Sequence, residues 1–179
     1  MSSTVPPRPS IVDIAVKHCK NIPPSRLESA KKIALKLYAI EKLFNVPPKL
    51  DGMLLAAACA ESGFNPNAKG DHKFSKNRRK PKAIGILQLW PWWESGKWGY
   101  KVNRLDPEAS GKAWMTHIQR QLKSVKRKCR FRSRTRLWIA AWVTAIRYPK
   151  PGGRCYERPK HLRYLKKFHK IRKRGSPKT

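Results

Sequence analysis

The feature that most constrains this chain is a run of seven apolar residues that ends in a single carboxylate. The stretch from Leu54 to Asn67 reads LLAAACAESGFNPN, so Glu61 closes the run and Gly63 follows it. The run predicts a central buried helix, and the Gly-Phe-Asn-Pro sequence predicts its end. Glu61 would then face a cleft, where apolar neighbours favour a proton donor; the alternative is a solvated acid at a helix end.

The composition favours one basic domain. The chain has 179 residues, with 42 lysines and arginines against 10 acidic residues and a formal net charge of +32. This length can bury one core. The charge attracts polyanions, whether nucleic acid, an anionic cell-wall polymer or lipid headgroups. We divide the chain into an N-terminal arm with a short helix (1–24), a main domain (25–170) and a basic C-terminal tail (171–179).

Apolar periodicity predicts a mainly α-helical fold with few strand signals. Ser25 and Glu28 have the form of a capping box at the start of a helix whose apolar face includes Leu27 and Leu43, and Asp106 is expected to cap a later helix. Residues 65–82 are expected to form a long basic loop with at most a minor β-hairpin. The expected helices are a short one that begins near residue 11 and others over 27–44, 48–61, 107–122, 136–146 and 159–171.

The cysteines and the N-terminus bear on cofactors and location. Cys19, Cys59, Cys129 and Cys155 form no C-x-x-C pair and have no histidine-rich partner segment, so we expect no metal and no organic cofactor. Cys59 is interpreted as a small core residue, and a Cys129–Cys155 disulfide is expected only in an oxidising compartment. No apolar signal core or membrane-spanning stretch is present, which predicts a soluble product of the cytoplasm.

Four segments, in one order over roughly residues 45–168, resemble the soluble lytic transglycosylases. VPPKLDGMLLAAACAESGFNPNA resembles the part of that family that carries the catalytic Glu in an E-S-G-F-N-P setting, and AIGILQLWP resembles its G-L-M-Q-L-x-P motif. DPEASGKAWMTHI is similar to its D-P-x-x-N-I-x-A-G-x-x-Y-L helix. LWIAAWVTAIRYPKPGGRCYERPKHLRYLKKF resembles its A-A-Y-N-A-G-P-G stretch and the tyrosine-bearing helix after it, with Trp142 in place of the family tyrosine.

The resemblance implies a lysozyme-like single domain that cleaves peptidoglycan between N-acetylmuramic acid and N-acetylglucosamine. One Glu acts as acid and then as base, so that the sugar's own 6-hydroxyl attacks and leaves a 1,6-anhydro end. On this resemblance Glu61 is the catalytic residue and Ser62 supports it. Gly85 lets the backbone approach, Gln88 contacts the sugar, and Tyr164 faces the carboxylate.

Other residues near the expected cleft have two interpretations each. Asp71 either positions a water, as in a hydrolytic muramidase related to the goose-type lysozymes, or is a loop acid paired with Lys69 or Lys73. Glu94 is also expected near the cleft mouth. The tryptophans after Gln88 either stack on sugar or belong to the core, whereas two later ones lie on a helical stripe typical of a core. The first group is Trp90, Trp92, Trp93 and Trp98, and the second is Trp138 and Trp142.

The positive charge supports a function of another class. The segments 127–136 and 160–178 resemble nucleic-acid-binding patches, so the alternative is a nucleic-acid-binding or virion structural protein on an inactive lytic scaffold. A solvated surface that aids wall binding is the simpler interpretation. An enzyme made in the cytoplasm would reach periplasmic peptidoglycan by another export route, through a holin or in a virion.

The positive charge also bears on Glu61. Because distant charges are screened, we expect burial to raise the pKa of Glu61.

Overall fold

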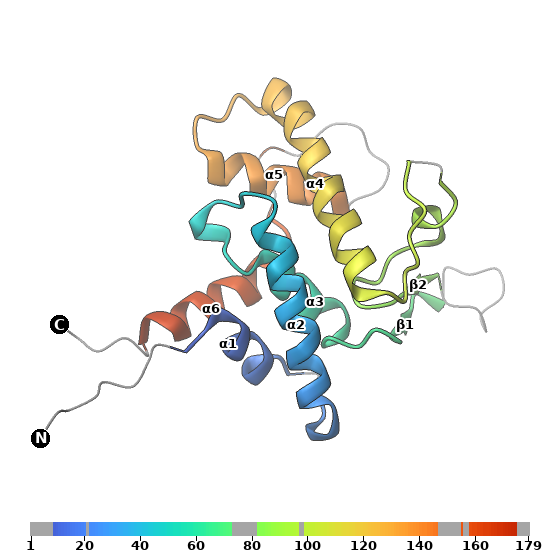
Figure 1. Ribbon diagram of the computed structural model, residues 1–179. Helices are drawn as coiled ribbons and strands as arrows, with labels where there is room; N and C mark the ends of the chain where they lie inside the picture. The colour runs from blue at the N-terminus through green and yellow to red at the C-terminus, as the bar shows by residue number, and fades with distance from the viewer. Residues whose placement is uncertain are drawn as a thin grey trace, which may run out of the picture.

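The fold is mainly helical with one small hairpin, as predicted (Figure 1). The computed structural model describes residues 9–20, 22–72, 82–96, 99–146, 155 and 158–174. Strands β1 (Lys69–Gly70) and β2 (Ala83–Ile84) pair antiparallel. No helix in these ranges is long and apolar enough to cross a membrane. The helices are α1 (Ile11–His18), α2 (Leu27–Lys42), α3 (Met53–Ser62), α4 (Pro107–Cys129), α5 (Arg134–Ile146) and α6 (Leu162–Arg174).

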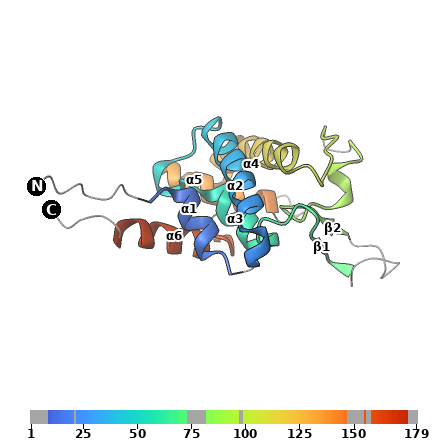
Figure 2. The same cartoon turned by 60° about the horizontal axis from the view of Figure 1, so that its bottom comes forward.

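Helix α3 lies at the centre of the core. Its residues 53–59 are each at most 1% exposed, which confirms the prediction from the apolar run. Helices α1, α2 and α6 pack around it (Figure 2). Helix α4 comes close because it has glycine at position 111, where a Cβ would lie 2.8 Å from Leu37 and 3.4 Å from Leu54. The central helix is therefore enclosed by segments from both ends of the chain.

A buried carboxylate closes the N-terminal end of α3. Glu41, on α2, is 1% exposed and accepts hydrogen bonds from the backbone N–H groups of Gly52, at 2.6 Å, and Leu54, at 2.7 Å. These groups belong to the first turn of α3, whose N–H groups have no partner within the helix. Burial raises the pKa of Glu41 to about 7, although the two backbone hydrogen bonds oppose the rise.

Two disulfides link segments that are far apart in the sequence. Cys129 at the end of α4 is bonded to Cys155, the pairing expected for an oxidising compartment. Cys59 is buried in α3 as predicted, but it also pairs with Cys19, just after α1. The sequence interpretation of Cys59 as a plain core residue therefore missed a covalent link between α1 and the central helix.

Several predicted boundaries differ from the structure. The capping box is wrong, because a 3-10 turn, η1 (Pro24–Arg26), leads into α2 and no side chain caps that helix. Leu27 and Leu43 are 43% and 75% exposed, so the apolar stripe of α2 is narrower than expected. The helix expected from residue 48 begins as a separate turn, η2 (Pro48–Leu50), and Gly52 then takes a positive φ of 87° before α3.

The described segments near both ends of the chain pack against the main domain. Helix α1, placed in the arm, contributes five buried residues to the core and packs on α6. Helix α6 continues through residues 171–174, which had been assigned to the tail. Arg172 donates to Asp51 at 3.0 Å, so this last turn is tied to the segment between α2 and α3. Residues 1–8 and 175–179 of the predicted arm and tail lie outside the described residues.

Glu41 makes the stability of the fold depend on pH. Its folded-state pKa, about 7, lies above the ordinary 4.5, so its protonated form stabilises the fold fully below pH 4.5. We expect this contribution, on the order of 3 kcal/mol, to be lost as pH rises to about 7. The free energy of unfolding of Glu41→Gln should therefore change less over this window, as measured by chemical denaturation at several pH values.

The exposed acid Glu28 on the same helix provides the matched control. Glu28→Gln should retain the pH dependence of the wild type. Equal slopes for the wild type and Glu41→Gln would show that Glu41 does not titrate in this range.

Candidate active site

Glu61 lies in the last turn of α3, where the helix leaves the core. The helix stops because Gly63 adopts a left-handed conformation, with φ 59° and ψ 42°, and its N–H bonds back to Cys59 O at 3.1 Å. The Glu61 side chain is 19% exposed, whereas the preceding turns of the helix are buried. The carboxyl at the helix end is thus largely buried, and the cleft that it was expected to face remains a prediction.

Two cationic or protonatable residues just before α6 hold this carboxylate. Lys160 Nζ lies 3.0 Å from Glu61 Oε1, and His161 Nε2 makes a short hydrogen bond to the same oxygen. The two partners differ in exposure, because the Lys160 side chain is 63% exposed and that of His161 is 2% exposed. Glu61 therefore has one fixed partner and one that solvent or a ligand can replace.

The predicted rise in the pKa of Glu61 is wrong. Burial is the largest single influence and does push the pKa upward, but the hydrogen bonds and positive charges of His161 and Lys160 together outweigh it. The pKa is lowered below its ordinary value. The free protein thus stabilises Glu61 as a carboxylate.

His161 is positioned by an aromatic stack behind it. Trp142 of α5 lies parallel to the imidazole, with centroids 5.8 Å apart and an interplanar angle of 20°, and Trp114 of α4 meets Trp142 edge-on. Trp142 is fully buried and Trp138 is 3% exposed, so the prediction that both belong to the core is confirmed. The Nδ1 atom of His161 is buried without a hydrogen-bond partner among the described residues.

An unpartnered Nδ1 favours one tautomer. If the imidazole carries its proton on Nε2, this N–H donates to Glu61 and Nδ1 keeps a lone pair. In the neutral ring, a proton on Nδ1 in place of Nε2 would be a buried donor with no acceptor and would leave Nε2 with no proton to donate to Glu61. The arrangement therefore favours Nε2–H as the donor to the carboxylate.

Ser62 joins the helix end to the loop that carries the second motif. Its hydroxyl donates to Ile86 O at 2.8 Å and accepts from the backbone N–H of Asn65 at 3.2 Å. The Ser62 hydroxyl therefore links the end of α3 to Ile86 in the loop and to Asn65 in the turn after the helix. The role that the resemblance implies for Ser62 remains a prediction.

Gly85 and Gln88 shape this loop. Gly85 has φ 80°, and a Cβ there would lie 1.8 Å from Arg104 O. The backbone that approaches Gly85 closely is therefore that of Arg104 in the same chain. The Gln88 amide donates to Gly85 O at 2.9 Å and to Ala68 O at 3.1 Å. Gln88 is half-buried, its nitrogen is occupied by these bonds, and its Oε1 lies against Gly70, where a Cβ would be 2.3 Å from it. The contact of Gln88 with a sugar remains a prediction.

A buried arginine, not recognised in the sequence, clamps the same loop. Arg104 is 7% exposed and donates to Lys82 O at 2.9 Å and Leu89 O at 2.8 Å. Its other terminal nitrogen lies 2.8 Å from Glu94 Oε2. The Glu94 carboxylate is thus part of this clamp.

Asp71 is bound to a tryptophan of the loop. Its carboxylate accepts the indole N–H of Trp90 at 3.0 Å, and Lys82 Nζ lies over the Trp90 ring at 5.2 Å. Both Asp71 and Trp90 are half-buried. This contact joins the β1 turn to the end of the second motif and differs from the lysine pairing considered from the sequence; Lys73 lies outside the described residues.

The remaining aromatic candidates are divided between core and surface. Trp93 is 3% exposed, and Trp92 stacks on it with centroids 4.4 Å apart. Trp98 lies outside the described residues. Tyr164 is half-buried one turn beyond His161, and Arg163 lies over its ring at 5.3 Å. His161 and Lys160 are thus the residues of this segment whose contact with Glu61 the structure shows.

Comparisons with protein-family models, curated proteins and solved structures gave no match to this chain. Within the described ranges, no cluster of three or more His, Cys, Asp or Glu side chains could hold a metal ion. The chemistry of the candidate site therefore has to be argued from Glu61 and its partners.

Removal of Lys160 should raise the pKa of Glu61, because a hydrogen bond and a positive charge that favour the carboxylate are lost. We expect Lys160→Gln to shift the titration upward, as followed by carbon-13 NMR of labelled Glu carboxyls and assigned with Glu61→Gln. Lys166→Gln removes the same charge from an exposed position further along the segment and should leave the titration in place. A lower pKa in Lys160→Gln would contradict the assignment.

Proposed function

We propose that this protein is a peptidoglycan lytic transglycosylase that cleaves the bond between N-acetylmuramic acid and N-acetylglucosamine through Glu61. The observation that carries the proposal is a largely buried carboxylate with an open edge, held by a buried histidine at the end of the central helix. The motif resemblance of the flanking segments names the substrate. No cofactor is needed, since proton transfer by one carboxyl is enough for this reaction.

The displaceable lysine provides a way to protonate the carboxylate. A glycan strand laid over Glu61 would displace the exposed Lys160 side chain and exclude water from the carboxylate. Loss of a cation and of solvent both favour the neutral acid, so the pKa of Glu61 rises when substrate binds. The carboxyl then carries the proton that the leaving oxygen needs.

The two steps return Glu61 to the protonated form in which the substrate complex began the reaction. Glu61 gives its proton to the glycosidic oxygen as the bond from that oxygen to C1 breaks. The carboxylate next takes the proton of the 6-hydroxyl while its oxygen bonds to C1, which leaves a 1,6-anhydro end and a protonated Glu61. No water is consumed. His161 keeps the carboxyl oriented through both steps by its hydrogen bond.

The disulfides support a place of action outside the reducing cytoplasm. Both pairs, Cys19–Cys59 and Cys129–Cys155, fit an oxidising compartment such as the periplasm, where peptidoglycan lies. Delivery there, by another export route, through a holin or inside a virion, belongs to this proposal. The strongly basic surface would favour binding to the anionic wall polymer.

Substitution of the catalytic carboxyl tests the proposal. We expect Glu61→Gln to lose at least about a hundredfold in the rate of sacculus lysis, because an amide cannot donate or accept the proton, and to retain binding to sacculi. Glu28→Gln, an exposed acid elsewhere, should lyse at the wild-type rate. Undiminished lysis by Glu61→Gln would refute the proposal.

Substitution of Asp71, together with analysis of the products, distinguishes transglycosylation from hydrolysis. If Glu61 acts alone, Asp71→Asn should keep the lysis rate within about twofold, because the amide oxygen can still accept the Trp90 indole N–H. Mass spectrometry of the wild-type products should give fragments one water lighter than hydrolysed ones. Hydrated products, together with a large loss of rate in Asp71→Asn, would instead identify a muramidase with two carboxylates.

A further inference from the structure

A groove with an apolar floor lies between α5, α6 and the η2 turn, separate from the Glu61 carboxylate. Its volume is about 750 Å³, which is within the range of small-molecule binding sites. Three of its apolar residues are buried and two are half-buried, so they form the floor and lower walls. These residues are Leu50, Phe131, Ile139, Leu162 and Leu165.

The rim of this groove is cationic. Six exposed lysines and arginines line it, none of the described lining residues is acidic, and no side-chain ion pair or hydrogen bond to another described residue holds any of the six. This contrasts with Lys36, Lys42 and Lys160, which are each paired with a carboxylate. The six are Lys49, Arg136, Arg158, Lys166, Lys170 and Lys173.

The cations on α6 form a row along the groove. Lys166, Lys170 and Lys173 are four and three residues apart, which places them on one face of the helix. Their spacing corresponds to rises of about 6 and 4.5 Å along the helix axis. Arg136 from α5 and Lys49 from η2 add charge from other elements, so an anion in the groove meets cations from several directions.

We propose that this groove binds an anionic phospholipid at a bilayer surface, with the phosphate among the rim cations and an acyl chain on the apolar floor. Four to eight lysines and arginines on an amphipathic helix are typical of anionic-lipid binding, and an apolar contact supplies the second attraction that stable membrane association needs. The long lysine side chains can reach the phosphate while their methylene groups cover apolar surface.

The floor favours a lipid over nucleic acid. Sites for single-stranded nucleic acid combine a basic groove with aromatic rings on which bases stack. Here the described lining holds two rings, Phe131 and His169, and the His169 ring already hydrogen-bonds Asp51 O at 2.7 Å. The other four floor residues are aliphatic. Backbone contacts to a duplex would use the cations but not the floor. An apolar floor is explained by an acyl chain.

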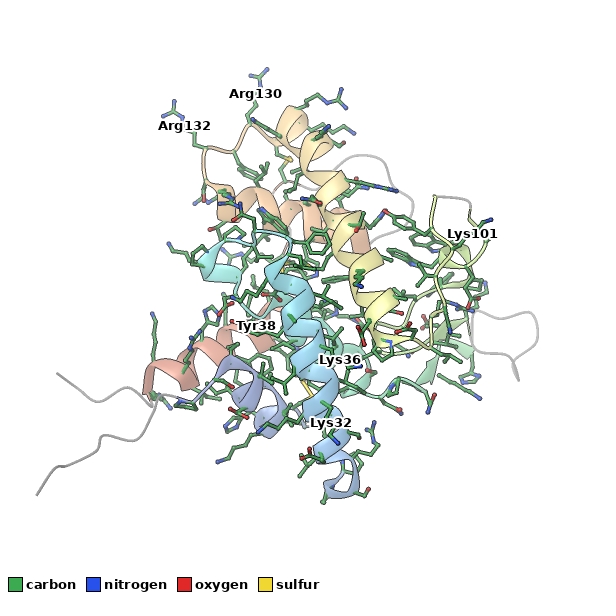
Figure 3. The ribbon with its side chains drawn as sticks, in the orientation of Figure 1. Lys32, Lys36, Tyr38, Lys101, Arg130 and Arg132 are labelled. Atoms are coloured by element: carbon green, nitrogen blue, oxygen red, sulfur yellow. A yellow bond between two sulfur atoms is a disulfide. The ribbon has the colours of Figure 1, made fainter. Side chains whose placement is uncertain are left out.

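The test uses the full oxidised chain and vesicles of phosphatidylglycerol mixed with phosphatidylcholine, at about 0.15 M salt. We expect binding to these vesicles in a flotation assay and none to pure phosphatidylcholine. Lys166→Glu/Lys170→Glu should weaken binding at least tenfold. Lys32→Glu/Lys112→Glu, an equal charge change at exposed positions on α2 and α4, should weaken it less than threefold; Lys32 projects from α2 (Figure 3).

The floor is tested separately from the charge. Ile139→Asn should weaken vesicle binding at least fivefold and leave the affinity for duplex DNA unchanged. Because this variant can lose stability, the wild type is also tested by competition: a soluble short-chain phosphatidylglycerol should displace it from vesicles, and the headgroup glycerophosphoglycerol should not at the same concentration.

Three results would overturn the proposal. Equal weakening by the two charge-reversal pairs would mean that net charge, and not the groove, drives binding. Equal competition by the headgroup and the short-chain lipid would mean that the floor is unused. Tight duplex binding without vesicle binding would identify nucleic acid as the partner. None of these readouts involves lysis, so Glu61→Gln should bind vesicles as the wild type does, and the proposal stands or fails independently of the catalytic one.

Discussion

The burial of α3 is the constraint on which the rest of the structure depends. A helix enclosed by apolar side chains cannot satisfy its terminal N–H and C=O groups with water. Glu41 accepts two of the N–H groups at one end, and the left-handed Gly63 turns an N–H back to the helix at the other. Because both ends have these partners, the last turn holds Glu61 at a defined place beside the start of α6.

The scarcity of acidic residues explains why so many of them join separate elements. Asp51 forms ion pairs with Lys42 of α2 and Arg172 of α6. It also accepts a hydrogen bond from Tyr38 of α2. Glu108 on α4 forms an ion pair with Lys36 of α2. In a chain with 42 cationic side chains and 10 acids, a carboxylate at an element boundary has cations within reach. Exposed pairs of this kind contribute little stability each, but the half-buried Asp51 cluster fixes where α6 lies.

Much of the fold could be predicted from the sequence, because its signals are local. The helix positions follow from apolar spacing, Asp106 caps α4 through the N–H groups of Glu108 and Ala109, and Trp138 and Trp142 are buried as their stripe indicates. The predicted capping box failed because the chain enters α2 through a 3-10 turn instead. Where two local signals compete, sequence alone does not rank them.

The residues that were missed depend on contacts between distant segments. His161 comes just before α6 and Tyr164 lies in its first turn, and which of them meets Glu61 depends on how that helix docks. The Cys19–Cys59 pairing likewise depends on how α1 packs on α3. Glu41 did leave a signal: Ala30, Ala34, Leu37 and Glu41 recur at helical spacing, which places an acid on a buried stripe.

The charge state of Glu61 shows that net charge is a poor guide to a single site. Burial alone would raise the pKa of this carboxyl, and two particular neighbours reverse the direction of the shift. Lys160 and His161 act at hydrogen-bond distance, whereas most of the other cations are exposed and screened by salt. The same segment that supplies them also carries Arg158 and Leu162 into the groove, and α6 continues with the lysine row. Its basic residues are therefore divided between two places, the Glu61 carboxylate and the groove.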